Sequence, residues 1–172
     1  MLARLFETLT QSALAQPLTL VHRDYHSRNL LVSAENDPGI LDFQDAVWGP
    51  VTYDVVSLLK DCYIEWPPAR VRVWALQHRE RLLAEGFASG ATEAQYMRWF
   101  DLVGLQRHIK VLGIFARLRY RDGKGQYLLD LPRVLHYIQR AAALYPETAQ
   151  FADFIARRVE PLFLRAQERE LA

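Results

Sequence analysis

Hydrophobic residues in the first third of the chain form short runs that are separated by polar loops. The run Leu-Thr-Leu-Val at residues 18–21 predicts a short buried strand. Two further runs flank the turn sequence Glu-Asn-Asp-Pro-Gly at residues 35–39, which predicts a β-hairpin over residues 30–43. Gly49-Pro50 is expected to break the chain after this hairpin.

The remaining hydrophobic positions repeat at the spacing of amphipathic helices. Thr92 followed by Gln95 resembles a capping box, Gly86 occupies a C-cap position, and Pro161 is expected to bend the last helix. The fold class is therefore α+β and mostly helical, with a β-hairpin that carries polar loops on a bundle of about five or six helices. The expected helices span residues 3–15, 53–65, 70–85, 92–120, 131–145 and 147–168.

Composition narrows the function without identifying it. The 172 residues are 51% hydrophobic and carry 21 Lys and Arg against 20 Asp and Glu, a net charge of +1. This near-balance argues against nucleic-acid binding, which favours a basic excess. The single cysteine, Cys62, forms no internal disulfide, and no apolar run is long enough for a membrane span. We therefore expect a cytoplasmic globular protein with no membrane partner.

Candidate chemistry concentrates in two stretches that adjoin the expected strands. Residues 22–29 read His-Arg-Asp-Tyr-His-Ser-Arg-Asn, and residues 40–43 read Ile-Leu-Asp-Phe. The H-R-D-x-x-x-x-N spacing places Asp24 and Asn29 on one loop, and the hairpin returns Asp42 beside them. An Asp that accepts a hydroxyl proton, with an Asn and a second Asp on magnesium, is the requirement of phosphoryl transfer.

The residues alone leave a second catalytic interpretation open. His22, Asp24 and His26 form an H-x-D-x-H cluster, which could belong to a zinc hydrolase. A zinc site of this kind needs further ligands in loops, and the other histidines lie on expected helices. We rank this interpretation last.

The expected helix over residues 92–120 carries Arg107, His108, Lys110 and Arg117. Such residues form a solvated, ion-paired helix face or, alternatively, contact a substrate. A guanidinium such as that of Arg107 matches a carboxylate in a bidentate fashion. Arg107 and His108 are therefore candidate substrate-binding residues.

At these motifs the chain resembles the aminoglycoside phosphotransferase and choline kinase superfamily, which is related to protein kinases. Residues 22–29 look like its catalytic loop, residues 40–46 like its metal segment, and Gly49 to Asp54 like the stretch that follows. The resemblance implies a kinase-like C-terminal lobe, a single domain over residues 1–172 with a helical substrate subdomain at 53–170.

The resemblance also implies roles for individual residues. Asp24 would be the catalytic base, and Asn29 and Asp42 would bind Mg²⁺. Asp54 would support the loop by hydrogen-bonding its backbone. Since Asp24 fills the role of base, we expect His22 to pack the loop against the core. The implied phosphoryl donor is ATP, with GTP as an alternative.

A narrower resemblance is to kinases that phosphorylate N-acetylmuramate or N-acetylglucosamine at the anomeric hydroxyl during peptidoglycan recycling. It rests on residues 41–55, 106–118 and 127–133. It implies an ATP-dependent phosphotransferase whose acceptor is a small hydroxylated amino sugar.

The chain departs from that family before the catalytic loop. No glycine precedes Gly39 and no lysine precedes Lys60, so the glycine-rich loop and the phosphate-binding lysine of the N-terminal lobe have no counterpart. We expect that lobe to be absent. The alternative to an active enzyme is an inactive isolated lobe that needs a separately encoded N-terminal lobe. The exposed docking face would then favour a homodimer.

Overall fold

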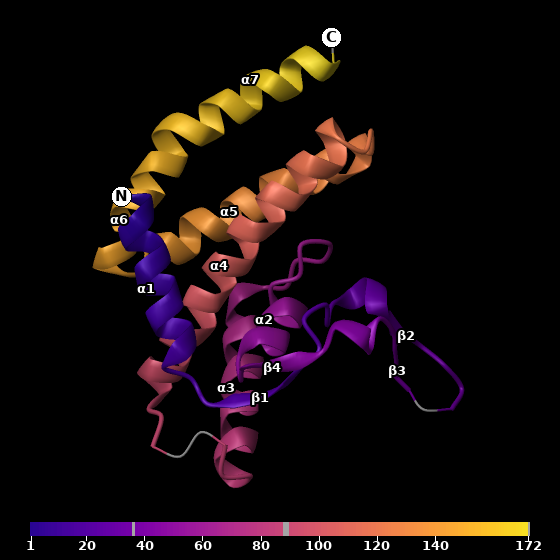
Figure 1. Cartoon of the computed structure of the whole chain (residues 1–172), viewed down its shortest axis with the longest axis vertical. Coiled ribbons are helices and arrows are strands. Elements are labelled where there is room, and N and C mark those ends of the chain that lie inside the picture. The colour runs from indigo at the N-terminus through magenta and orange to yellow at the C-terminus, as the bar shows by residue number, and fades with distance from the viewer. Residues whose placement is uncertain (36, 88–89, 172) are drawn as a thin grey trace.

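The longest helix, α4 (Glu93–Tyr120), is the element on which most others pack (Figure 1). The computed structural model describes residues 1–35, 37–87 and 90–171, so Asn36 of the predicted turn lies outside it. The Thr92 hydroxyl accepts the Gln95 amide N–H at 3.2 Å and caps α4. The predicted start and end of this helix are confirmed.

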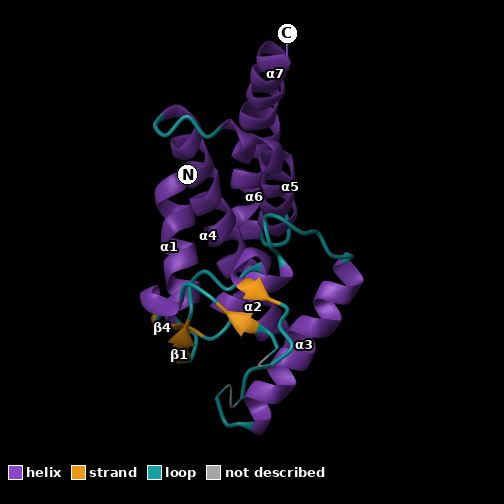
Figure 2. Cartoon of the chain, turned by 90° about the vertical axis from the view of Figure 1, so that its right-hand side faces the viewer, coloured by secondary structure: helices purple, strands orange, loops and turns teal. Residues whose placement is uncertain are grey.

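Two hydrophobic clusters meet on α4. In the first, α1 (Leu2–Leu14), α5 (Leu131–Ala142) and α6 (Pro146–Phe154) pack along α4. In the second, α2 (Tyr53–Leu59) and α3 (Pro68–Ala84) pack on its N-terminal half. Figure 2 shows α3 and the C-terminal helix α7 (Glu160–Leu171) at opposite ends of the molecule. The side chains that centre the clusters are Leu105, Val134 and Ile138 in the first and Val56, Ala75, Tyr96, Phe100 and Val103 in the second.

An ion pair between the partly buried Lys60 and the buried Asp101 lies where the two clusters join. Lys60 Nζ lies 2.8 Å from Asp101 Oδ1, and the Tyr145 hydroxyl donates to Asp101 Oδ2 at 3.0 Å. Both carboxylate oxygens are therefore satisfied, which a buried charge requires.

The strands form two small antiparallel sheets. β2 (Leu30–Leu31) pairs with β3 (Gly39–Ile40), which confirms the predicted hairpin, and Figure 1 shows it projecting from the helices. β1 (Leu18–Val21) pairs with β4 (Val47–Pro50), a strand that the sequence did not predict. The predicted break at Gly49-Pro50 was wrong because Gly49 faces Val21. A Cβ at position 49 would lie 3.2 Å from Val21 Cγ2, so glycine permits close pairing there.

The prediction that β1 is buried was also wrong. Val21 is buried, whereas Leu18 and Leu20 are 56% and 65% exposed. Leu20 pairs with Trp48, which is exposed as well. A two-stranded sheet that the helices cover on one side leaves its other side chains open to solvent.

Several helix boundaries differ from the prediction. α2 ends at Leu59 rather than near Trp66, and α5 ends before Tyr145. A π-helical segment, η4 (Ile155–Val159), joins α6 to α7. The predicted irregularity at Pro161 therefore falls in the turn before it, where a wider helical turn tolerates a residue without an N–H.

The end of α3 follows its sequence closely. Gly86 has φ 78°, the Gly86 N–H donates to Leu83 O at 3.1 Å, and the Phe87 N–H donates to Leu82 O at 2.8 Å. This is a Schellman ending, and it confirms the predicted C-cap. None of the helices that the structure describes is long and apolar enough to cross a membrane.

Candidate active site

Two polar loops lie side by side because their flanking strands pair. The 22–29 loop connects β1 to β2 and ends in a short 3₁₀ turn, η1 (Ser27–Asn29). The 41–46 loop connects β3 to β4 and contains the 3₁₀ turn η2 (Phe43–Asp45). Since β1 pairs with β4 and β2 with β3, both ends of the two loops are brought together (Figure 1).

Three hydrogen bonds join the two loops. The His22 ring Nε2 lies 2.8 Å from Leu41 O, and the Arg23 guanidinium donates to Asp45 O at 3.3 Å. The Leu41 N–H donates to Asn29 O at 3.0 Å and extends the hairpin by one bond. Asp42 directly follows Leu41, so these contacts bring its backbone to the seam between the loops.

The backbone of the 22–29 loop is held in an uncommon conformation at Arg23, whose φ is 76°. A side chain with a Cβ is disfavoured there by about 1–3 kcal/mol. The Asp54 carboxylate compensates, because Oδ2 accepts the His22 N–H at 2.6 Å and Oδ1 accepts the Arg23 N–H at 3.1 Å. This is the backbone contact that the resemblance implies for Asp54, and it comes from the first turn of α2.

Arg107 binds the carbonyl group of Arg23, whose N–H is held by Asp54. Its guanidinium donates to Arg23 O at 3.0 Å and to the Ser57 hydroxyl, and it lies 4.4 Å from the centroid of the Tyr53 ring. Arg107 is therefore not a solvated helix residue. It supports the 22–29 loop from α4.

Asp61 anchors the second half of the loop, and sequence reasoning missed it. Its side chain is buried, with Oδ2 accepting the Ser27 N–H at 2.9 Å and Oδ1 accepting the Tyr63 N–H at 2.8 Å. The early end of α2 at Leu59 lets the chain turn so that this carboxylate reaches both amides. No sequence motif marks it, because Ser27 lies 34 residues away.

His108, which the sequence offers as a candidate substrate-binding residue, is buried behind the 22–29 loop, where it lines a small cavity together with His26 and Arg107. It is 3% exposed, its Nε2 lies 2.9 Å from Lys60 O, and its ring stacks on Tyr137 at 4.7 Å. Burial lowers the pKa of His108 to about 3, so the ring is neutral. It packs the helical core behind the loop.

His26, from the H-x-D-x-H cluster, is partly buried. Its ring meets the Tyr63 ring edge-on at 5.5 Å. Burial lowers the pKa of His26, and the negative charges of Asp61 and Asp24 oppose that shift. The His26 N–H donates to Asp24 O at 3.1 Å, so His26 and Asp24 belong to one turn of the loop.

The proposed magnesium ligands offer oxygen atoms of the type that this ion prefers. The Asn29 amide nitrogen donates to Asp24 O at 3.0 Å, which leaves its Oδ1 as an acceptor. Asp42 is exposed and its backbone is left-handed, with φ 59°. Magnesium bound with nucleotide takes one or two protein oxygens and fills its other positions with phosphate and water, so these residues fit it.

The zinc interpretation fails. His22 already uses Nε2 on Leu41 O. Residues 1–35, 37–87 and 90–171 contain no group of three or more His, Cys, Asp or Glu side chains arranged to hold a metal. A metal site built wholly from such ligands is therefore not found in this part of the chain.

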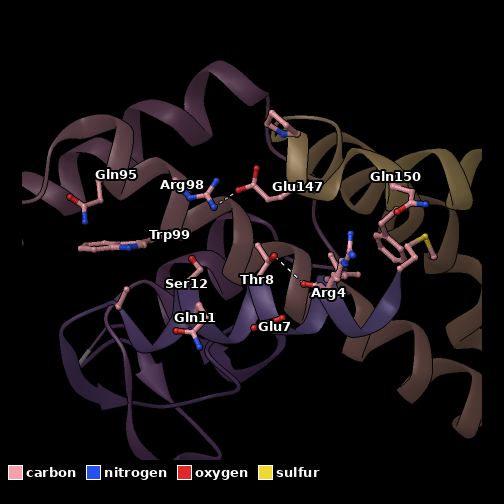
Figure 3. Close-up of a pocket in the computed structure, with 15 residues that line it drawn as sticks. Arg4, Glu7, Thr8, Gln11, Ser12, Gln95, Arg98, Trp99, Glu147 and Gln150 are labelled. Carbon is pink, nitrogen blue, oxygen red and sulfur yellow. Dashed lines mark hydrogen bonds and ion pairs between the residues drawn. The ribbon is translucent and has the colours of Figure 1, made fainter.

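A cavity of about 870 Å³ lies elsewhere (Figure 3). It opens between α1, the start of α4 and the start of α6, where Arg98 pairs with Glu147 beside Trp99. No residue of either polar loop lines it. A second cavity, of about 20 Å³, lies under the 22–29 loop, has room for one water, and is lined by residues that include His26, Asp61 and Arg107.

Comparison with known proteins gives the family. The model of the phosphotransferase enzyme family, APH, matches residues 1–91, which is more than half of the chain and contains both polar loops. The chain belongs to this family. The phosphotransferase match also includes Asp54 and Asp61, the two carboxylates that hold the 22–29 loop.

Curated phosphotransferase relatives carry a more specific name. The chain is 50% identical over 153 residues to the N-acetylmuramate/N-acetylglucosamine kinase of Pseudomonas putida and 46% identical over 153 residues to that of Pseudomonas aeruginosa. Each match covers 89% of this chain and 45% of the relative. The enzyme of that name from Neisseria meningitidis is 46% identical, over 83% of this chain and 42% of its own length. The chain thus spans less than half the length of these relatives.

Proposed function

We propose that this chain is the catalytic part of a kinase that transfers a phosphoryl group from magnesium-ATP to a hydroxyl of a small amino sugar. The observation that carries this proposal is the pairing of the two loops on which Asp24, Asn29 and Asp42 lie, the 22–29 and 41–46 loops. The names of the relatives support N-acetylmuramate and N-acetylglucosamine as acceptors. GTP is the alternative donor.

In this proposal Asp24 accepts the proton of the attacking hydroxyl. Its position depends on the residue before it. Asp54 takes the N–H groups of His22 and Arg23, while Arg107 takes the carbonyl of Arg23. The peptide that leads into Asp24 is therefore fixed on both sides, which preorganises the base for a bound hydroxyl.

Asn29 Oδ1 and the Asp42 carboxylate would hold the magnesium ion. The ion supplies charge neutralisation of the nucleotide phosphates when it is bound. Asn29 is well suited because its amide nitrogen is tied to Asp24 O, so the metal ligand and the base share one rigid turn.

We also propose that the chain folds as a kinase-like C-terminal lobe, with the helical part over residues 53–170 around the acceptor. The relatives are more than twice as long as the matched region, and nucleotide binding would draw on that additional length. Exposed apolar side chains on the outer face of the β1–β4 sheet support a covering lobe or a second copy there, and Leu18, Leu20 and Trp48 belong to them.

The test is phosphate transfer from magnesium-ATP to each of the two sugars by the purified chain. We expect turnover that falls by about 10²–10⁴-fold in Asp24→Asn, which keeps the size of the side chain but removes the base. Equal turnover in the two proteins would contradict the assignment of Asp24. Folded protein with no turnover in either would favour the alternative of a lobe that does no chemistry unaided.

A further inference from the structure

One cation of the 22–29 loop lies over an aromatic ring of the helical part. Arg28 lies on η1, next to the proposed metal ligand Asn29 and four residues after Asp24. Its side chain is exposed, and its guanidinium carbon lies 3.6 Å from the centroid of the Tyr63 ring. A guanidinium that stacks on an aromatic face keeps its N–H edge free for a planar anion.

The Tyr63 ring is a fixed platform for this cation. Its backbone N–H is held by Asp61, the carboxylate that also holds the Ser27 N–H of the loop. The ring packs on His26 at 5.5 Å and on Phe115 of α4 at 6.4 Å. Burial raises the pKa of the Tyr63 hydroxyl, so the platform stays neutral. Arg28 and Asp24 are therefore carried by one rigid frame.

The charge of Arg28 is unpaired within residues 1–35, 37–87 and 90–166, whose side chains contribute no carboxylate at ion-pairing distance. Arg107, by contrast, donates from both terminal nitrogens to groups of the protein, Arg23 O and the Ser57 hydroxyl. An oriented guanidinium without a partner is a strong receptor for a carboxylate or phosphate.

The position of Arg28 favours the acceptor over the nucleotide. Its platform packs on the helical side, through Phe115 and onward to Tyr127 at 5.3 Å from Phe115. The metal loop lies on the strand side, where His22 and Arg23 contact it. The anion that reaches Arg28 is therefore expected on the side of the site away from the metal-bound phosphates.

We propose that Arg28 binds a carboxylate of the acceptor and makes the site prefer N-acetylmuramate, which carries a lactyl carboxylate, over the neutral N-acetylglucosamine. This inference rests on the proposed function, because it assumes that the acceptor binds beside Asp24. It differs from the sequence-based expectation, which gave the carboxylate to Arg107.

The experiment measures the equilibrium binding of each sugar to the full chain by NMR titration. It compares the unaltered protein with Arg28→Gln and Arg28→Lys. We expect N-acetylmuramate to bind about tenfold tighter than N-acetylglucosamine, consistent with one charge-assisted contact at a partly exposed site. Arg28→Gln should bring the ratio to about one by weakening N-acetylmuramate alone. Arg28→Lys should keep part of the preference.

Arg117→Gln is the matched control, since Arg117 is an exposed arginine on α4. It should leave the ratio unchanged. The inference is overturned if Arg28→Gln keeps the preference, if it weakens both sugars equally, or if it weakens ATP while sparing the sugar ratio. Absence of binding by either sugar overturns it as well.

Binding requires no phosphoryl transfer, so the two proposals fail separately. Asp24→Asn should retain the sugar preference. A chain without turnover whose sugar ratio depends on Arg28 would remove the proposed activity and keep this subsite. If the chain turns over both sugars and Arg28→Gln leaves the ratio of their kcat/KM values unchanged, the proposed activity stands and the Arg28 subsite is overturned.

Discussion

The two loops of the candidate active site are held in different ways. Asp54, Arg107 and Asp61 reach the 22–29 loop from the helical part and bind its backbone N–H and C=O groups. The 41–46 loop is exposed over residues 41–45 and is linked mainly to the 22–29 loop itself. The loop with the proposed base is therefore fixed by the fold, whereas the loop with Asp42 has few anchors of its own.

This difference matches what each loop must do. A general base works only if it is positioned before the substrate hydroxyl arrives. A metal ligand can complete its geometry when the ion and nucleotide bind, because the ion supplies strong contacts of its own. We expect the 22–29 loop to be ordered without ligand and the 41–46 loop to gain order with it.

The largest effect should come from removing the buried anchor of the fixed loop. Asp61→Ala leaves the Ser27 and Tyr63 N–H groups without an acceptor, and we expect the free energy of unfolding to fall by about 2–4 kcal/mol. Urea denaturation measures this. Asp45→Ala, an exposed carboxylate in the other loop, should cost less than about 0.5 kcal/mol. Equal losses of unfolding free energy in the two variants would contradict the view that the 22–29 loop is more firmly anchored than the 41–46 loop.

A smaller effect should follow from loosening the peptide before Asp24. Arg107→Gln shortens the side chain that donates to Arg23 O, so this hydrogen bond is lost. We expect kcat to fall about tenfold while KM for the sugar changes little. Arg107→Lys keeps the charge and one donor and should recover part of the loss. Steady-state kinetics provides both constants. A rise in KM with unchanged kcat would instead assign Arg107 to substrate binding.

The smallest effect on stability should come from the exposed metal loop. Asp42→Asn keeps a side chain that tolerates the left-handed backbone, so the free energy of unfolding should change by less than about 0.5 kcal/mol. Magnesium-dependent turnover should nevertheless fall at least about 100-fold. Thermal unfolding and a magnesium titration of activity separate the two quantities. A large loss of stability would show that this loop is anchored as firmly as its neighbour.

Local signals predicted much of the fold. Thr92 with Gln95 marked the start of α4, Gly86 marked the end of α3, and the turn at 35–39 marked the hairpin. β4 was missed because Gly49 reads as a breaker until Val21 is known to lie against it. That contact depends on chain pairing, which local propensity does not contain.

The same division holds in the site. The spacing of Asp24 and Asn29 is local, and their hydrogen bond lies within five residues. Arg107 reaches Arg23 over 84 residues, so its role in loop support could not be read from its helix alone. The burial of His108 could not be read from its helix either, since only its packing against Lys60 and Tyr137 shows it.

Amide hydrogen exchange of the two loops, with and without magnesium-ATP, tests the central claim most directly. In the ligand-free chain, the amides of His22, Arg23 and Ser27 should be protected, because carboxylates accept them. Amides of residues 42–45 should exchange fast and slow only when magnesium-ATP is added. Equal protection of the two loops without ligand, or no change in the 41–46 loop on adding it, would contradict the account.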